Sequence, residues 1–239
     1  MGRLSREREL LESAVTYAMA EAELITPQLL SSPTPCPGWD LEMLLDHLVD
    51  SIRVLHEAMA TGAVSADVAP GVAVVPRPDP LARLHSETAR LLDTDAVAES
   101  TERAVYIGDR QLTASMVMVA GAIEIAVHGW DISVACGAAR VIPPSLVAVL
   151  LPIAPLLITA ETRPGLFADP VRLTGPASPG DELVAFLGRQ PAPLGSARTL
   201  QRLARHPGNA DPATIPRHPA GLYHQPAQPA ARNSPEQEQ

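Results

Sequence analysis

The sequence predicts an all-α protein, an up-down four-helix bundle with one or two extra short helices. Apolar residues recur at three- and four-residue steps over several long segments, which is the period of a helix with one buried face. Prolines, glycines and good cap residues fall between these segments. Segments with the two-residue alternation of a half-buried strand are scarce. The helices are therefore expected to bury their apolar faces against one another.

Each expected helix follows from local signals. In the first, Leu11, Val15 and Ala18 lie on one face, and in the second Asp40 makes a good N-cap. Gly137 has the position of a glycine that ends a helix. Residues 94–110 are ambiguous, and 104–107 is a candidate for a short extended piece. The six expected helices cover about residues 4–25, 41–59, 81–92, 112–135, 144–162 and 181–187.

Composition excludes several classes of function. The chain has 239 residues, and all 18 basic residues are Arg, so chemistry that needs a Schiff-base or P-loop lysine is excluded. A formal charge of −9 disfavours a nucleic-acid partner, because binding phosphates needs clustered cations. The two cysteines, Cys36 and Cys136, do not make a disulfide framework. With no apolar signal region at the start, a cytoplasmic protein is expected.

Two stretches bear on domain organisation. Residues 190–239 hold nine of the 25 prolines, so we expect a folded domain over residues 1–192 and a Pro/Ala-rich, disordered tail over 193–239. Residues 141–160 carry no charge and are long enough to span a bilayer. Four prolines in this run favour a buried helix of a soluble bundle instead. No membrane partner is therefore expected.

The residues that carry chemistry centre on one carboxylate. Glu124 is the only polar residue in the run 116–127, and His128 follows four residues later on the same helical face. His47 lies on the apolar side of the second helix. If the bundle brings the three together, two imidazoles and one carboxylate make an open site for a divalent metal, by default zinc, with nickel, iron or manganese as alternatives. The other interpretation is a buried Glu–His hydrogen bond and an unrelated core histidine.

Other residues near these positions have two interpretations each. Trp39 and Trp130 either wall a pocket or serve packing alone. Asp131, three residues after His128, either orients that imidazole as an acceptor or forms a surface ion pair. Cys36 is either a nucleophile or a packed small thiol. His56 lies half a turn around the helix from His47 and is not expected to be a ligand.

Three segments resemble a known family. TPCPGWDLEMLLDHLVD (34–50) and EIAVHGWDISVACG (124–137) resemble the two hallmarks of the mycothiol-dependent maleylpyruvate isomerase N-terminal domain family, a branch of the DinB/YfiT-like bundles. The ending at 165–191 resembles a single-domain actinobacterial subgroup described as metal-binding. The resemblance covers about residues 5–192. It implies a four-helix core and a divalent metal, usually zinc, held by His47, Glu124 and His128.

The same resemblance implies a function. In the family a small thiol, mycothiol, is thought to bind the metal through its sulfur. We therefore expect a thiol-dependent enzyme that acts on a small electrophilic substrate by isomerisation, conjugation or S-transfer. The isomerase itself has a second domain where this chain has a Pro-rich segment, so the resemblance is more specific for fold and metal site than for reaction. A non-catalytic metal- or ligand-binding module and a metal-free structural bundle are the alternatives. A homodimer is possible for such bundles.

Overall fold

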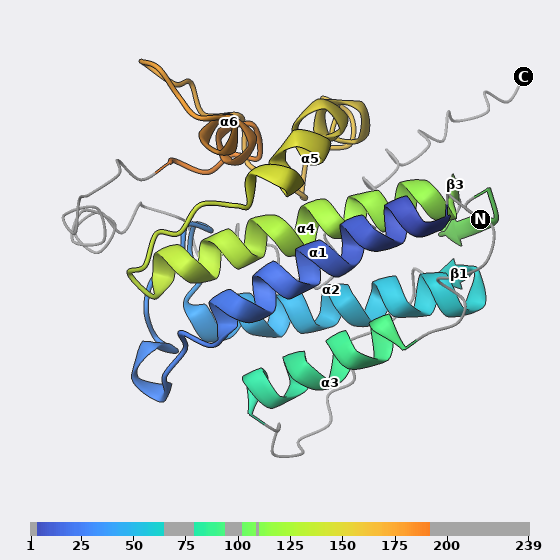
Figure 1. Ribbon diagram of the computed structural model, residues 1–239, viewed down its shortest axis with the longest axis horizontal. Helices are drawn as coiled ribbons and strands as arrows, with labels where there is room; N and C mark the ends of the chain where they lie inside the picture. Colours follow the sequence, from blue (N-terminus) through green and yellow to red (C-terminus); the bar gives the residue numbers. More distant parts are fainter. Residues whose placement is uncertain (1–3, 65–78, 94–101, 109, 192–239) are drawn as a thin grey trace, which may run out of the picture.

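The computed structural model describes residues 4–64, 79–93, 102–108 and 110–191, and this part of the chain is mostly helical (Figure 1). It contains six α-helices, one 3-10 turn and three short strands. The predicted tail, 193–239, lies outside the described residues. In chain order the elements are α1 (Leu4–Ala22), η1 (Pro27–Leu29), α2 (Leu41–Thr61), β1 (Ala63–Val64), α3 (Pro80–Leu92), β2 (Ala104–Ile107), β3 (Arg110–Thr113), α4 (Ala114–Ala135), α5 (Pro144–Leu157) and α6 (Pro179–Phe186).

The long helix α4 lies at the centre of the arrangement. Helix α1 runs alongside it, α2 packs against it from another side, and α3 packs against α2 (Figure 1). Helices α5 and α6 contact each other beyond α4. Because α4 is covered from several sides, every residue from Gly121 to Ala135 is buried. This placement explains why nearly the whole helix is apolar, and it puts any polar side chain on α4 inside the protein.

The helices begin and end at residues that satisfy their terminal backbone groups. Asp40 caps α2 as predicted, accepting a hydrogen bond from the backbone N of Met43 at 2.9 Å. Gly137 follows α4 in the left-handed conformation, also as predicted, with φ 76°. Helix α4 begins at Ala114 rather than near 112, because Thr113 closes a strand and caps the helix through the backbone N of Met116.

The prediction of an all-α protein missed a small sheet. Strand β2 is the extended piece considered at 104–107; it pairs antiparallel with β3 and parallel with β1, giving the order β1-β2-β3. Gly108 takes a positive φ of 58° where the chain leaves β2. Strands of two to four residues are too short to show a periodic pattern, so the sequence signal was weak.

Helix α5 differs from the expected buried helix. Only Leu146, Val147, Leu150 and Ala154 are buried in it, while Leu156 is 75% exposed. It ends at Leu157, five residues earlier than predicted, and the chain turns there with the backbone N of Thr159 donating to Oγ1 of Thr162. The only described helix long and apolar enough to cross a membrane is α4, and 94% of its most apolar window is buried within the protein, as in the core helix of a globular fold.

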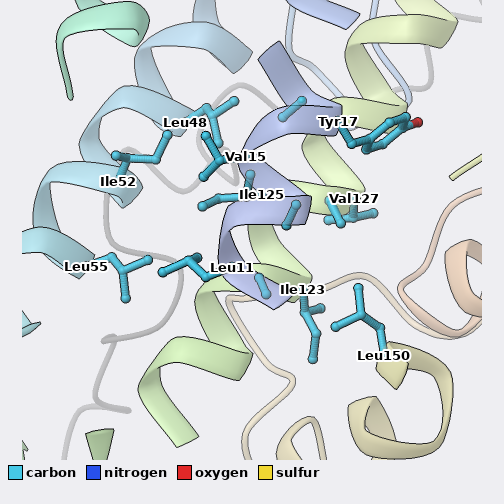
Figure 2. Close-up of a cluster of buried hydrophobic side chains, with 14 of the residues drawn as sticks. Leu11, Val15, Tyr17, Leu48, Ile52, Leu55, Ile123, Ile125, Val127 and Leu150 are labelled. Atoms are coloured by element: carbon cyan, nitrogen blue, oxygen red, sulfur yellow. The ribbon is translucent and has the colours of Figure 1, made fainter. Parts of the chain in front are cut away.

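The core lies between α1, α2 and α4 (Figure 2). Leu11 and Val15 of α1 meet Ile125 of α4, and Leu48 and Ile52 of α2 face them. Helices α1 and α4 lie close together at Gly129, where a Cβ atom would lie only 3.0 Å from the Cα of Ala18. This core fixes α2 and α4 in the register that places the next group of residues.

Candidate metal centre

Helices α2 and α4 bring His47, Glu124 and His128 together. Glu124 and His128 are one helical turn apart on α4, and His47 comes from the facing side of α2. Their side chains are 6%, 4% and 10% exposed for Glu124, His128 and His47 respectively. The unrelated core histidine considered for His47 is therefore not what the structure shows.

The two imidazoles converge on one carboxylate oxygen. Nε2 of His47 lies 2.9 Å from Oε1 of Glu124, and Nε2 of His128 lies 3.1 Å from the same oxygen. The ring centroids of the two histidines are 5.0 Å apart, with the planes nearly perpendicular at 82°. Three atoms of the kinds that can ligate a metal thus lie within 4.8 Å of one another in a buried position.

The electrostatics of this cluster are those of a buried ion pair. Burial alone raises the pKa of Glu124, but the two neighbouring imidazoles outweigh it and hold that pKa well below its ordinary value. For His128, burial alone lowers the pKa, yet the Glu124 charge and the hydrogen bond to Asp131 raise it well above its usual value. Both net shifts arise from the close contact between Glu124 and His128 inside the protein.

Asp131 supports His128 from behind. Its Oδ2 lies 2.9 Å from Nδ1 of His128, on the ring edge opposite Glu124. The side chain of Asp131 is fully buried, so the surface ion pair considered from the sequence is wrong, because α4 is covered on this face too. The contact matches the other interpretation, an acceptor that orients the imidazole.

Arg189, which sequence reasoning missed, completes this layer. Its Nη2 lies 3.0 Å from Oδ2 of Asp131, and its side chain is 8% exposed. Burial raises the pKa of Asp131, but the Arg189 guanidinium and the hydrogen bond from His128 outweigh it and lower that pKa. The sequence signal for this pair was weak. It consisted of Arg189, a single arginine after the apolar residues of α6, and of Asp131, a single aspartate in an apolar helix.

Cys36 lies at the edge of the same layer. Its Sγ is 3.3 Å from Oδ2 of Asp131 and 3.4 Å from Nη2 of Arg189. Cys36, His128 and Asp131 could by spacing form a second metal group. However, the guanidinium already lies against two of these three side chains and supplies the positive charge there. The arrangement consequently favours His47, Glu124 and His128 for a metal.

The two tryptophans lie differently. The Trp39 ring contacts the His47 ring edge-on, with centroids 4.8 Å apart and an interplanar angle of 61°. Trp39 is half-buried, so it covers one edge of the cluster. Trp130 is 6% exposed and belongs to the hydrophobic core. Of the two, Trp39 is the one placed to wall a site, whereas packing accounts for Trp130.

The residues present fit a divalent metal. Two imidazoles and a carboxylate are the ligands of open zinc sites, which leave a fourth position for water or a substrate. Ligand atoms around a tetrahedral zinc lie about 3.3 Å apart, so the 2.9 and 3.1 Å separations seen here need to widen by only a few tenths of an ångström. Whereas Nδ1 of His128 has Asp131 as its partner, Nδ1 of His47 is buried with no hydrogen-bond partner among the described residues. The Trp39 ring lies edge-on against this imidazole.

A mostly helical fold that buries two histidines and one carboxylate together defines a class of helical proteins with a candidate metal centre. The family model for the mycothiol maleylpyruvate isomerase N-terminal domain matches residues 11–133, a region that contains His47, Glu124 and His128. The chain belongs to this family, which confirms the resemblance seen in the sequence.

Two further comparisons give proteins that this chain is similar to. The chain is 28% identical over 163 residues to uncharacterized proteins of Mycobacterium tuberculosis, MT0763 of strain CDC 1551 and Rv0738 of strain H37Rv, covering 67% of this chain and 85% of each relative. Among solved structures it resembles a histidine-to-alanine mutant of the mycothiol-dependent maleylpyruvate isomerase, with a TM-score of 0.50 and 17% identity. That match covers 68% of this chain and 72% of the isomerase chain, and it supports the fold.

Proposed function

We propose that this protein is a metal- and thiol-dependent enzyme that isomerises, conjugates or transfers sulfur to a small electrophilic substrate. His47, Glu124 and His128 would hold the divalent metal, with zinc the first choice and nickel, iron or manganese able to use the same ligands. The observation that carries the proposal is the convergence of both Nε2 atoms on one buried oxygen of Glu124. Membership of a family named for mycothiol and maleylpyruvate isomerisation supports the use of a thiol.

The chain's own residues prepare this chemistry. A divalent cation held there would lower the pKa of a bound thiol and so supply a nucleophile at neutral pH. Glu124 contributes the one negative charge among the three ligands. Asp131 accepts from Nδ1 of His128 and keeps Nε2 of that ring directed at the cluster. Trp39 excludes water from the edge of His47, and burial strengthens every electrostatic interaction inside.

Metal content of purified protein tests the site. We expect about one equivalent of zinc in the wild type and none in His128→Ala, because removal of one of three ligands weakens an open site severely. His56→Ala is the matched control: this half-buried histidine is on the same helix as His47 but belongs to no candidate metal group among the described residues. Unchanged zinc content in His128→Ala would refute the assignment, and a metal-free wild type would favour a structural Glu–His pair.

Cobalt substitution tests the thiol. Adding mycothiol or glutathione to the Co²⁺ protein should produce a near-ultraviolet thiolate-to-metal charge-transfer band. Cys36→Ser is the control, because this thiol lies against Asp131 beside the cluster and must not be the source of the band. Metal binding without any thiol band or turnover would favour the alternative, a non-catalytic metal- or ligand-binding module.

A further inference from the structure

The C-terminal segment that follows the family-matched region reaches the candidate metal centre through Arg189. Arg189 lies after α6, and its residue is 7% exposed. The backbone N of Gly188 donates to the carbonyl of Ala185, and that of Arg189 to the carbonyl of Val184, which together make a Schellman motif. Gly188 has φ +83°, and a Cβ there would collide with the backbone of Ala168. The start of the Arg189 side chain is thus fixed by the end of α6.

The donors of Arg189 are nearly all engaged within the protein. Nη2 donates to Oδ2 of Asp131 at 3.0 Å and to Sγ of Cys36 at 3.4 Å, and Nε donates to Oδ1 of Asp131 at 3.4 Å. Nη1 donates to the carbonyl of Leu187 at 2.7 Å. These four contacts leave at most one of the five N–H groups of a guanidinium free. Arg189 is therefore poorly placed to bind a substrate anion, and its fork holds both oxygens of Asp131 instead.

The Arg189 guanidinium stabilises the buried carboxylate of Asp131. Its carboxylate is completely buried, and a buried carboxylate without a positive partner is costly. Held by the guanidinium, Oδ2 is fixed where it accepts from Nδ1 of His128 at 2.9 Å. The acceptor fixes the plane of the imidazole, so that Nε2 points at Glu124.

We infer that Arg189 is a positioning residue of the candidate metal centre, acting on the His128 imidazole through Asp131. The inference rests on the proposed function of His47, Glu124 and His128. It also means that the segment after residue 133 is part of the site. Arg163 offers a matched contrast: it is in the same segment and is 8% exposed, but its guanidinium lies 4.7 Å from the Phe186 ring centroid and donates to the carbonyl of Ala168.

Cobalt titration followed by visible absorption, with Co²⁺ as the probe, tests the inference. In Arg189→Met we expect about a 10- to 100-fold loss of Co²⁺ affinity, the usual effect of removing an outer-sphere partner, together with a changed ligand-field spectrum. Arg189→Lys should recover part of both, because it restores the charge without the fork. Arg163→Met should lower thermal stability and leave affinity and spectrum at wild-type values. Wild-type affinity and spectrum in Arg189→Met would overturn the inference.

Two measurements separate positioning from misfolding and from failure of the proposed function. In an Asp131→Asn background Arg189→Met should lower Co²⁺ affinity no further; the same loss in both backgrounds would overturn the route through Asp131. In metal-free protein the Nδ1–H proton of His128 should give a slowly exchanging NMR signal that Arg189→Met shifts or removes. If the wild type binds no cobalt, the His128 Nδ1–H signal still tests the inference. A signal that changes in Arg189→Met supports positioning of the ring without a metal, and a signal that does not change overturns the inference.

Discussion

The close approach of α1 and α4 at Gly129 sets a measurable cost for one methyl group. In Gly129→Ala the new Cβ would lie 3.0 Å from the Cα of Ala18 and 3.1 Å from Cε1 of Tyr17. Carbon atoms in contact ordinarily lie about 3.5–4.0 Å apart, so α1 must withdraw by about 0.5–1 Å. Overpacking of this kind costs about 1–3 kcal/mol, and the better helix propensity of alanine returns about 1 kcal/mol. We expect a net loss of about 0–2 kcal/mol in the free energy of unfolding.

Urea denaturation followed by circular dichroism measures this loss, and Gly121→Ala is the matched control. A Cβ at Gly121 also meets a neighbour, but the contact is with the side-chain end of Leu55, which can rotate away, whereas the Cα of Ala18 cannot move without its helix. Gly121→Ala should therefore cost less than Gly129→Ala. If Gly129→Ala is more stable than the wild type, or if Gly121→Ala is the more damaging change, the reasoning from backbone contact fails.

Three further predictions concern stability. Tyr17→Phe should leave the protein equally stable or stabilise it by about 1 kcal/mol at pH 7, because the buried hydroxyl has no partner among the described residues. Burial and then the Glu21 charge raise the pKa of Tyr17, so the phenol ionises less readily in the folded protein than in the unfolded chain. The folded state therefore loses stability as pH rises above the unfolded pKa of about 10. Urea midpoints should fall above pH 10 in the wild type more than in Tyr17→Phe. Asp40→Ala should cost about 1 kcal/mol by removing the cap of α2, with Asp40→Asn as the control that keeps it. The pKa of Asp131 is lowered in the folded protein. The stability that its carboxylate contributes is therefore present above the unfolded pKa of about 3.9 and is lost as pH falls through the lowered value. Asp131→Asn should flatten the acid limb of a pH–stability curve, and an unchanged limb would contradict this.

Features with a local cause could be predicted from the sequence. Asp40 and Gly137 act within a few residues of themselves, and both occupy the predicted positions at helix ends. The meeting of His47, Glu124 and His128 could be anticipated because charge and imidazole on apolar helical faces must turn inward, where few partners exist. Which metal these residues bind stays a prediction.

Features that depend on residues far apart in the chain could not be predicted from the sequence. Arg189 and Asp131 are 58 residues apart, and nothing near either residue specifies the other. The strand β1 has two residues and exists because a parallel partner lies more than forty positions later in the chain. The exposed side of α5 was also missed, since a helix that is apolar all round gives no sign of which face its neighbours leave uncovered.

The position of Arg189 in the chain has a consequence for how the protein is made. Synthesis proceeds from the N-terminus, so the three candidate ligands are present once residue 128 has been added, and Arg189 follows much later. Until then Asp131 lacks the guanidinium that lies 3.0 Å from its carboxylate in the folded protein. The nascent chain can therefore gather α1, α2 and α4 early, but Arg189 can hold Asp131 only after the last described helix, α6, has been synthesised and has docked.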